Sequence, residues 1–140
     1  MIEQTGKSIE QLVGTQFAAM MKTMNQMLRS VGDGSAIVSS TPLPKFENTM
    51  SRMHGGYVAA LIDTALGCAV ATKLPANTGY GTVDLNVKFV RRIDMETGEL
   101  FATANALHIG RTMLTAEAKV ADANGTLYAH GSGTFLVYPT

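Results

Sequence analysis

The sequence predicts an α+β domain in which a curved antiparallel sheet wraps around one long central helix, with an extra helix at the N-terminus. Three observations predict this fold. The segment from His54 to Lys73 lacks proline and carries apolar residues on every side, which is typical of a helix buried in a core. Four later segments alternate apolar and polar residues, as strands do. The last three of them have many alanines and glycines on one face, which lets a sheet curve closely around a helix.

The composition fits a soluble protein of one domain. The 140 residues comprise an N-terminal helix and turn (residues 1–34) and a main part of the domain (residues 35–140). The 11 basic and 11 acidic residues balance, so there is no electrostatic case for binding nucleic acid or an anionic membrane. Only 16% of residues are charged, which favours a surface partly covered by a subunit interface.

Cysteine use and the N-terminus predict the compartment. The single cysteine, Cys68, excludes an internal disulfide and fits a reducing environment. The first residues lack the continuous apolar run of a signal peptide. A cytoplasmic location is therefore expected.

The first expected element is an amphipathic helix from Ser8 to Leu28, in which apolar residues, many of them methionine, recur at three- and four-residue steps. Ser8 is a suitable N-cap, and Gly32-Asp33-Gly34 is expected to end the helix. We interpret the methionine stripe as core or interface packing. The alternative is a flexible lid over an acyl-binding groove, because methionine adapts to varied apolar shapes.

The next segment leads into the central helix. A short edge strand is expected at Ala36 to Val38. Thr41 to Pro44 must follow an extended path, because its two prolines exclude a helix. Lys45 to Met53 is expected to be a polar loop that contains Asn48 and delivers the chain to His54.

The central helix carries one carboxylate, Asp63, inside its apolar run. Burying an unpaired charge is costly, so this residue needs an explanation. One explanation is catalytic, as a general base for water or as a nucleophile that forms a mixed anhydride. The other is structural, a pairing with Thr64, Thr82 or an arginine across a dimer interface.

The helix begins with the sequence His54-Gly55-Gly56. Backbone N–H groups in the first turn of a helix are unpaired, and together with the positive end of the helix dipole they can stabilise an oxyanion. The alternative is that the two glycines only allow a tight entry into the helix.

Four strands are expected after the turn-rich segment Leu74 to Gly79, and they span Thr82 to Val90, Glu99 to Ile109, Thr112 to Ala121 and Thr126 to Tyr138. Strict alternation in the first strand places Val83, Leu85, Val87 and Phe89 on one face, and Thr82, Asp84, Asn86 and Lys88 on the other. The run Asp122 to Gly125 is a strong hairpin signal between the last two strands.

This pattern resembles the hotdog-fold acyl-CoA thioesterases, specifically the phenylacetate-pathway thioesterase (PaaI-like) family. The similarity spans Pro44 to Val137 and is carried by Asn48, His54-Gly55-Gly56, Asp63, Gly81 to Val87, Phe89-Val90-Arg91, Gly110-Arg111-Thr112 and Asp122 to Gly125. It implies a hotdog fold, a homodimer with a continuous sheet and commonly a homotetramer built as a dimer of dimers. It also implies hydrolysis of acyl-CoA thioesters with no metal, no cofactor other than the CoA of the substrate, and no Ser/His/Asp triad.

The resemblance also implies residue roles. The Gly55 N–H would bind the thioester carbonyl oxygen, and Asp63 of one subunit would face Asn48 and Gly55 of the other. Asn48 would orient the attacking water or the thioester; its alternative is a turn in the loop. Thr82 would help to hold water near the carboxylate, or is an ordinary strand threonine. His54 would fix the loop and the helix entry rather than act as a base.

A second group of residues is expected to contact CoA. Arg91, Arg92 and Arg111 lie at strand ends and turns, where they are suited to phosphate groups. The other candidates are Gly56, Lys88, His108 and Gly110. Each charged member has the alternative of being a solvated surface residue. No metal site is expected because the three histidines lack suitably spaced partners, and Cys68 is interpreted as a small core residue.

The leading hypothesis is therefore an acyl-CoA thioesterase acting on aryl or medium-chain acyl groups. One alternative is a hotdog dehydratase or hydratase, which would need a histidine paired with a carboxylate as its acid–base couple. Another is a non-catalytic acyl-CoA sensor. The histidine that precedes the glycine pair favours the thioesterase, and Asp63 counts against a sensor.

Overall fold

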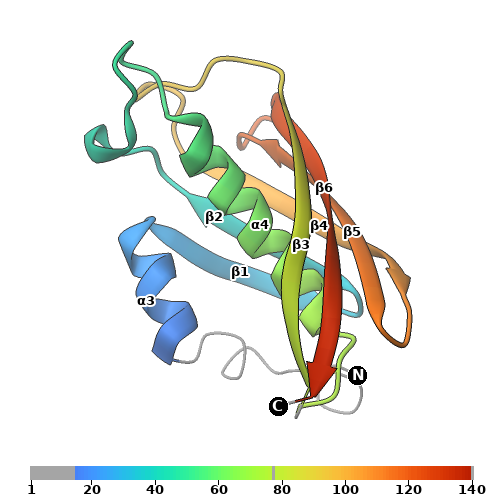
Figure 1. Ribbon diagram of the computed structural model, residues 1–140. Helices are drawn as coiled ribbons and strands as arrows, with labels where there is room; N and C mark the ends of the chain where they lie inside the picture. Colours follow the sequence, from blue (N-terminus) through green and yellow to red (C-terminus); the bar gives the residue numbers. More distant parts are fainter. Residues whose placement is uncertain (1–14, 77, 140) are drawn as a thin grey trace.

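The computed structural model describes residues 15–76 and 78–139. Its helices are α3 (Thr15–Thr23) and α4 (Gly55–Ala71), with a short 3-10 helix at Pro44–Phe46. Its strands are β1 (Gln26–Gly32), β2 (Ser35–Ser40), β3 (Thr78–Phe89), β4 (Leu100–Ile109), β5 (Met113–Ala121) and β6 (Leu127–Pro139). The strands form one antiparallel sheet in the order β1-β2-β4-β5-β6-β3, with α4 lying along one of its faces (Figure 1).

The helix α4 is the centre of the core, as its apolar sequence predicts. Its side chains from Leu61 and Ile62 onward are almost all buried against the sheet. The Thr72 hydroxyl ends the helix by donating to the carbonyl of Ala69 and accepting from the backbone N–H of Gly34, at 2.7 and 2.9 Å. The end of the central helix is thereby tied to the turn between β1 and β2.

Small residues on the inner face of the sheet allow the helix to approach closely. The expected inner faces of β4 and β5 are confirmed, because Leu100, Ala102, Ala104, Leu114, Ala116, Ala118 and Val120 are all buried. On β6, a β-carbon placed on Gly133 would lie 3.1 Å from Cδ1 of Leu66 and 3.2 Å from the Asp84 carbonyl oxygen, so a larger residue would crowd this approach. The curvature that the alanine and glycine content predicts follows from such contacts.

The N-terminal prediction is partly wrong. Only Thr15–Thr23 of the expected helix is helical among the described residues, and Ser8 lies outside them. Asn25 ends the helix with a positive φ of 55°, a conformation typical of helix C-termini. Residues Gln26–Gly32 then form β1, which pairs with β2. The boundary expected at residue 34 therefore falls inside a β-hairpin.

The physical reason is that Asp33-Gly34 acts as a hairpin turn rather than as a helix stop. Gly34 has a φ of 79°, and Gly32 pairs with Ser35 across the turn. Hydrogen bonding to β2 outweighs the helical spacing of the methionines. The strand expected at Ala36 to Val38 is confirmed as part of β2, but it is not an edge strand, because β1 covers its outer side. The sheet consequently has six strands instead of the five expected, and the additional strand is β1.

The alternation expected for β3 is also wrong at one point. The register with β6 shifts between Thr82 and Asp84, so Val83 forms a β-bulge. Thr82 pairs with the buried Phe135 and Leu85 pairs with the inner-face Gly133, which places Thr82 and Leu85 on the same face. An extra residue in a strand interrupts the alternation, so side chains on the two sides of the bulge point to the opposite faces from those that strict alternation predicts.

The arrangement is the hotdog fold that the resemblance implies, with an additional N-terminal helix next to β1 (Figure 1). No helix within the described residues is long and apolar enough to cross a membrane.

Candidate active site

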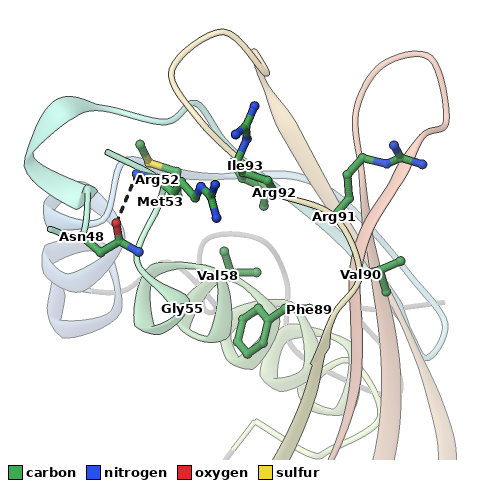
Figure 2. A pocket seen from close by; sticks show the side chains of 10 residues that line it. All are labelled: Asn48, Arg52, Met53, Gly55, Val58, Phe89, Val90, Arg91, Arg92 and Ile93. Atoms are coloured by element: carbon green, nitrogen blue, oxygen red, sulfur yellow. Dashed lines mark hydrogen bonds between the residues drawn. The ribbon is translucent and has the colours of Figure 1, made fainter. Parts of the chain in front are cut away.

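A pocket of about 300 Å³ lies at the N-terminal end of α4 (Figure 2). Its walls come from the loop before α4, the first turn of α4, the end of β3 and the loop after β3; the lining residues are Asn48, Arg52, Met53, Gly55, Val58, Phe89, Val90, Arg91, Arg92 and Ile93. The two loops are held together by a hydrogen bond from the Met53 N–H to the Ile93 carbonyl, at 2.8 Å. Four of the residues expected at the site, Asn48, Gly55, Arg91 and Arg92, meet in this pocket.

His54 organises the start of the helix as its N-cap. Its Nδ1 accepts a hydrogen bond from the Gly56 N–H at 2.8 Å. Its carbonyl accepts from the N–H groups of Tyr57 and Val58, at 3.0 and 3.4 Å. These contacts make His54 the N-cap of α4. They leave the Gly55 N–H as the donor of the first turn that has no acceptor among the described residues.

Removing this cap should cost stability. We expect His54→Ala to lower the free energy of unfolding by about 1 kcal/mol, the usual cost of losing a side-chain N-cap. His54→Asn should retain most of it, because asparagine is also a good N-cap. Urea unfolding of the two variants and the wild type measures the difference, and equal losses in both variants would contradict the capping role.

Asn48 is held by its own loop. Its Oδ1 accepts hydrogen bonds from the backbone N–H groups of Met50 and Arg52, at 2.8 and 3.2 Å. The turn suggested as its structural alternative is therefore present. These bonds use only the oxygen, and Nδ2 lies on the side towards the start of α4 (Figure 2). Asn48 thus combines a turn with a free amide donor at the pocket.

Asp63 lies further along α4, where it is half-buried beside β3. Burial raises its pKa, and a hydrogen bond from the Thr82 hydroxyl to Oδ1, at 3.0 Å, lowers it; burial is the larger effect. The structural alternative named for Asp63 included Thr82, and this contact is present. The β-bulge at Val83 makes the contact possible, because it turns Thr82 to the helix side of the sheet.

Gly55 and Asp63 do not meet within one chain. Asp63 follows Gly55 by eight positions, which corresponds to a rise of about 12 Å along the helix axis. They do share one face of α4, because the helix residues that stay partly exposed form a single stripe: Gly55, Gly56, Ala59, Ala60, Asp63 and Thr64. This stripe is the part of α4 that its own sheet leaves uncovered.

The strand next to this stripe is an unprotected edge. β3 is the last strand of the sheet, and its apolar side chains Val83, Leu85 and Phe89 are 53%, 36% and 58% exposed. A long apolar edge strand is a template for pairing with another chain. The exposed stripe and the exposed edge thus form one continuous uncovered surface.

The remaining expected residues are dispersed. The Gly56 N–H is occupied by His54, and Lys88 on β3 donates to Oδ1 of Asn86 at 3.0 Å. His108, Gly110 and Arg111 lie at the turn between β4 and β5, at the opposite end of β4 from the loop that carries Ile93. They therefore do not line the pocket of their own chain, and their contact with CoA stays a prediction.

Six residues that line the pocket are absent from the expected site residues: Arg52, Met53, Val58, Phe89, Val90 and Ile93. Arg52 lies between Asn48 and His54, and this proximity in the loop was the available signal. Phe89 was assigned to an apolar strand face and to a motif of the family resemblance, but not to the site. Nothing in the sequence indicates that its ring reaches the start of α4. Cys68 is fully buried, which raises the pKa of its thiol to about 12 and fits a core residue.

Comparisons with known proteins indicate the family of this chain. Residues 50–129 match the family described as the thioesterase superfamily. A relative from Halobacterium salinarum named "Putative esterase VNG_1336C" is 40% identical over an alignment of 94 residues that covers 61% of this chain. The match spans 60% of that relative's length.

Solved structures show the same fold. The conserved protein PA5202 from Pseudomonas aeruginosa has a TM-score of 0.83 at 28% identity, covering 94% of this chain and 100% of its own. A thioesterase family protein from Silicibacter pomeroyi has a TM-score of 0.83 at 21% identity, covering 93% and 98% of the two chains. The PaaI protein from the phenylacetic acid degradation operon of E. coli has a TM-score of 0.75 at 23% identity, covering 85% and 88%.

Proposed function

The chain belongs to the thioesterase superfamily, and we propose that it hydrolyses the thioester of aryl- or medium-chain acyl-CoA to the free acid and CoA. The observation that carries this proposal is the unpaired Gly55 N–H, which lies in a pocket at the N-terminus of α4 and on the same exposed stripe as the half-buried Asp63. A backbone donor at a helix N-terminus is suited to a developing oxyanion.

The proposed active site is shared between two subunits. Because about 12 Å of helix separates Gly55 from Asp63, one thioester cannot contact both in the same chain. A two-fold axis near Ala59 and Ala60 would pair the β3 edges of two copies and place Gly55 of one copy opposite Asp63 of the other. The small side chains of the stripe allow the two α4 helices to approach closely. Further association into a tetramer stays a prediction.

The proposed chemistry needs four groups. Asp63 takes a proton from water as the water oxygen bonds to the thioester carbonyl carbon, while the Gly55 N–H stabilises the oxyanion. The intermediate then collapses, the C–S bond breaks, and the proton on Asp63 passes to the CoA thiolate. Thr82 orients the carboxylate and Asn48 donates to the water or the thioester. Burial supports this role for Asp63, because a raised pKa makes a carboxylate a stronger base.

The arginines at the pocket rim suit the phosphates of CoA. Arg52, Arg91 and Arg92 line the pocket, and the side chain of Arg91 extends away from Gly55 (Figure 2). Phosphates must lie away from the thioester, because the pantetheine arm is about as long as four extended peptide units, on the order of 14 Å. The proposal requires no metal and no cofactor besides the CoA of the substrate.

The alternative functions fit these contacts less well. A dehydratase or hydratase needs a histidine paired with a carboxylate, but Nδ1 of His54 is engaged with the Gly56 N–H. His54 also lines a different pocket, formed with Met24, Lys45, Phe46, Glu47 and Tyr57. A sensor has no need for a half-buried carboxylate with a raised pKa.

The direct test is release of free CoA by the wild-type protein from a panel of acyl-CoAs, detected with a thiol reagent. Aryl- and medium-chain substrates should be hydrolysed fastest. Tight binding of acyl-CoA without release of CoA would support the sensor, and loss or addition of water across the acyl chain would support the dehydratase or hydratase.

The pH dependence gives an independent prediction for Thr82. Asp63 acts as a base only when ionised, so the rate should fall as the pH drops through its raised pKa. The Thr82 hydroxyl lowers that pKa, so Thr82→Val should raise it and move the acid limb of the kcat profile to higher pH. Thr103→Val, on the exposed outer face of β4, is the control. An acid limb that stays in place or moves to lower pH would argue against this role.

A further inference from the structure

The side chain of Phe89 covers the start of the central helix. Phe89 is the last residue of β3, and its ring lies against the first turn of α4 beside Val58 (Figure 2). A β-carbon placed on Gly55 would lie 3.3 Å from Cζ and 3.6 Å from Cε1 of this ring. The Phe89 ring therefore lies next to the space that a side chain at position 55 would occupy.

The backbone around Phe89 is fixed by hydrogen bonds. Phe89 pairs with the buried Ala129 on β6. The N–H groups of Val90 and Arg91 both donate to the carbonyl of Tyr128, at 2.9 and 3.1 Å. The ring is thus positioned by the end of a strand rather than by a loop.

Core packing does not account for this position. The Phe89 side chain is 58% exposed, in contrast to Phe135 on the same sheet, which is 1% exposed. The contact with α4 is made at Gly55, whose N–H is the unpaired donor of the first turn. Hydrogen bonds strengthen where water and its high dielectric constant are excluded.

We propose that Phe89 is a positioning residue of the oxyanion site, and that glycine is favoured at position 55 because the Phe89 ring packs closely against it. The ring forms an apolar wall over the Gly55 N–H, keeps water from one side of the donor, and strengthens its hydrogen bond to the oxyanion. The inference rests on the proposed thioesterase function, since it assigns Phe89 to the same site.

The test is a double-mutant cycle with Gly55→Ala and Phe89→Ala, measuring kcat and KM for acyl-CoA hydrolysis. Alanine at position 55 keeps the N–H but crowds the ring and forces it to shift. Each single substitution should therefore lower kcat about tenfold, a modest loss for a misplaced active-site group. The double variant should be no slower than the slower single variant, because both substitutions remove the same contact. Phe89→Leu should retain more activity than Phe89→Ala.

Two controls separate this role from others. Leu85→Ala removes another exposed apolar side chain from the β3 edge that does not line the pocket, and it should lower kcat less than Phe89→Ala does. Light scattering and thermal unfolding check that all variants keep the association state and fold of the wild type. The loss for Phe89→Ala should be the same for short and long acyl groups, because the ring lies at the position of the carbonyl.

Three results would overturn the inference. A hundredfold loss of kcat in the double variant would mean that the two substitutions act independently. A loss of kcat in Leu85→Ala equal to that in Phe89→Ala would mean a general effect on the β3 edge, and an effect confined to KM would mean that the ring does not act on the oxyanion. Failure of the wild type to release CoA would instead contradict the proposed function itself, so the two failures are distinguishable.

Discussion

Asp63→Asn is expected to lower kcat for acyl-CoA hydrolysis by about a hundredfold or more, the range for losing a general base. The amide has nearly the same shape as the carboxylate, and its oxygen can still accept the hydrogen bond from Thr82, so the fold and association state should be retained. Release of CoA under saturating substrate measures the loss. Asp84→Asn, on the exposed side of β3 next to the bulge, is the matched control and should leave kcat unchanged. Equal turnover in Asp63→Asn and wild type would reject the assignment of Asp63.

The same substitution should stabilise the protein at neutral pH. The pKa of Asp63 is raised in the folded state, so the fold favours the protonated acid over the carboxylate. The resulting cost is fully present above the folded pKa and disappears as the pH falls below the unfolded value of 3.8. Asp63→Asn should therefore unfold at a higher temperature than wild type at pH 7, with the difference fading in acid. A loss of both stability and activity would indicate a structural role for the carboxylate.

The sequence predicts the core of this fold because periodicity there is set by burial. An apolar run with no wet face matches α4, and the alternation in β4 to β6 matches strands with one face on the helix. The prediction is wrong at Gln26–Gly32, where the methionine spacing suits a helix but the chain forms a strand that pairs with β2. Local spacing cannot reveal such pairing, because its hydrogen bonds come from a strand beyond a turn.

Active-site contacts are likewise predicted best between residues that are close together in the sequence. Gly55 and His54 adjoin in sequence, so the pattern of a capped helix start is visible from the residues alone. Thr82 was selected even though strict alternation places it on the wrong face, and only the bulge at Val83 brings it to Asp63. Phe89 lies far from Gly55 in the sequence and touches it only through the curvature of the sheet. The spacing of apolar and polar residues along the chain does not reveal that contact.

Gly55→Pro should lower kcat by about 10²–10³-fold relative to Gly55→Ala, the range measured for loss of one oxyanion donor in another hydrolase. Both variants carry a β-carbon that meets Phe89, but only proline lacks the N–H. Proline is well tolerated at the first position of a helix, and His54 has the extended backbone, with ψ of 139°, that a residue before proline requires. Thermal unfolding checks that the helix start survives. Equal kcat values for the two variants would reject Gly55 as the oxyanion donor.

Combining the two inactive variants then tests whether the site is shared. A hybrid dimer of Asp63→Asn and Gly55→Pro subunits, isolated with two different affinity tags, contains one site in which Gly55 and Asp63 are both intact and one in which both are lost. Because a two-fold interface gives two equivalent sites in the wild type, the hybrid should recover about half of the wild-type kcat per dimer. If each active site lay within a single subunit, every site of the hybrid would carry one lesion and no activity would return. Recovery of activity in the hybrid would therefore show that one site uses residues of both subunits. Misfolding of either parent variant, or contamination of the hybrid with either of them, cannot produce this recovery.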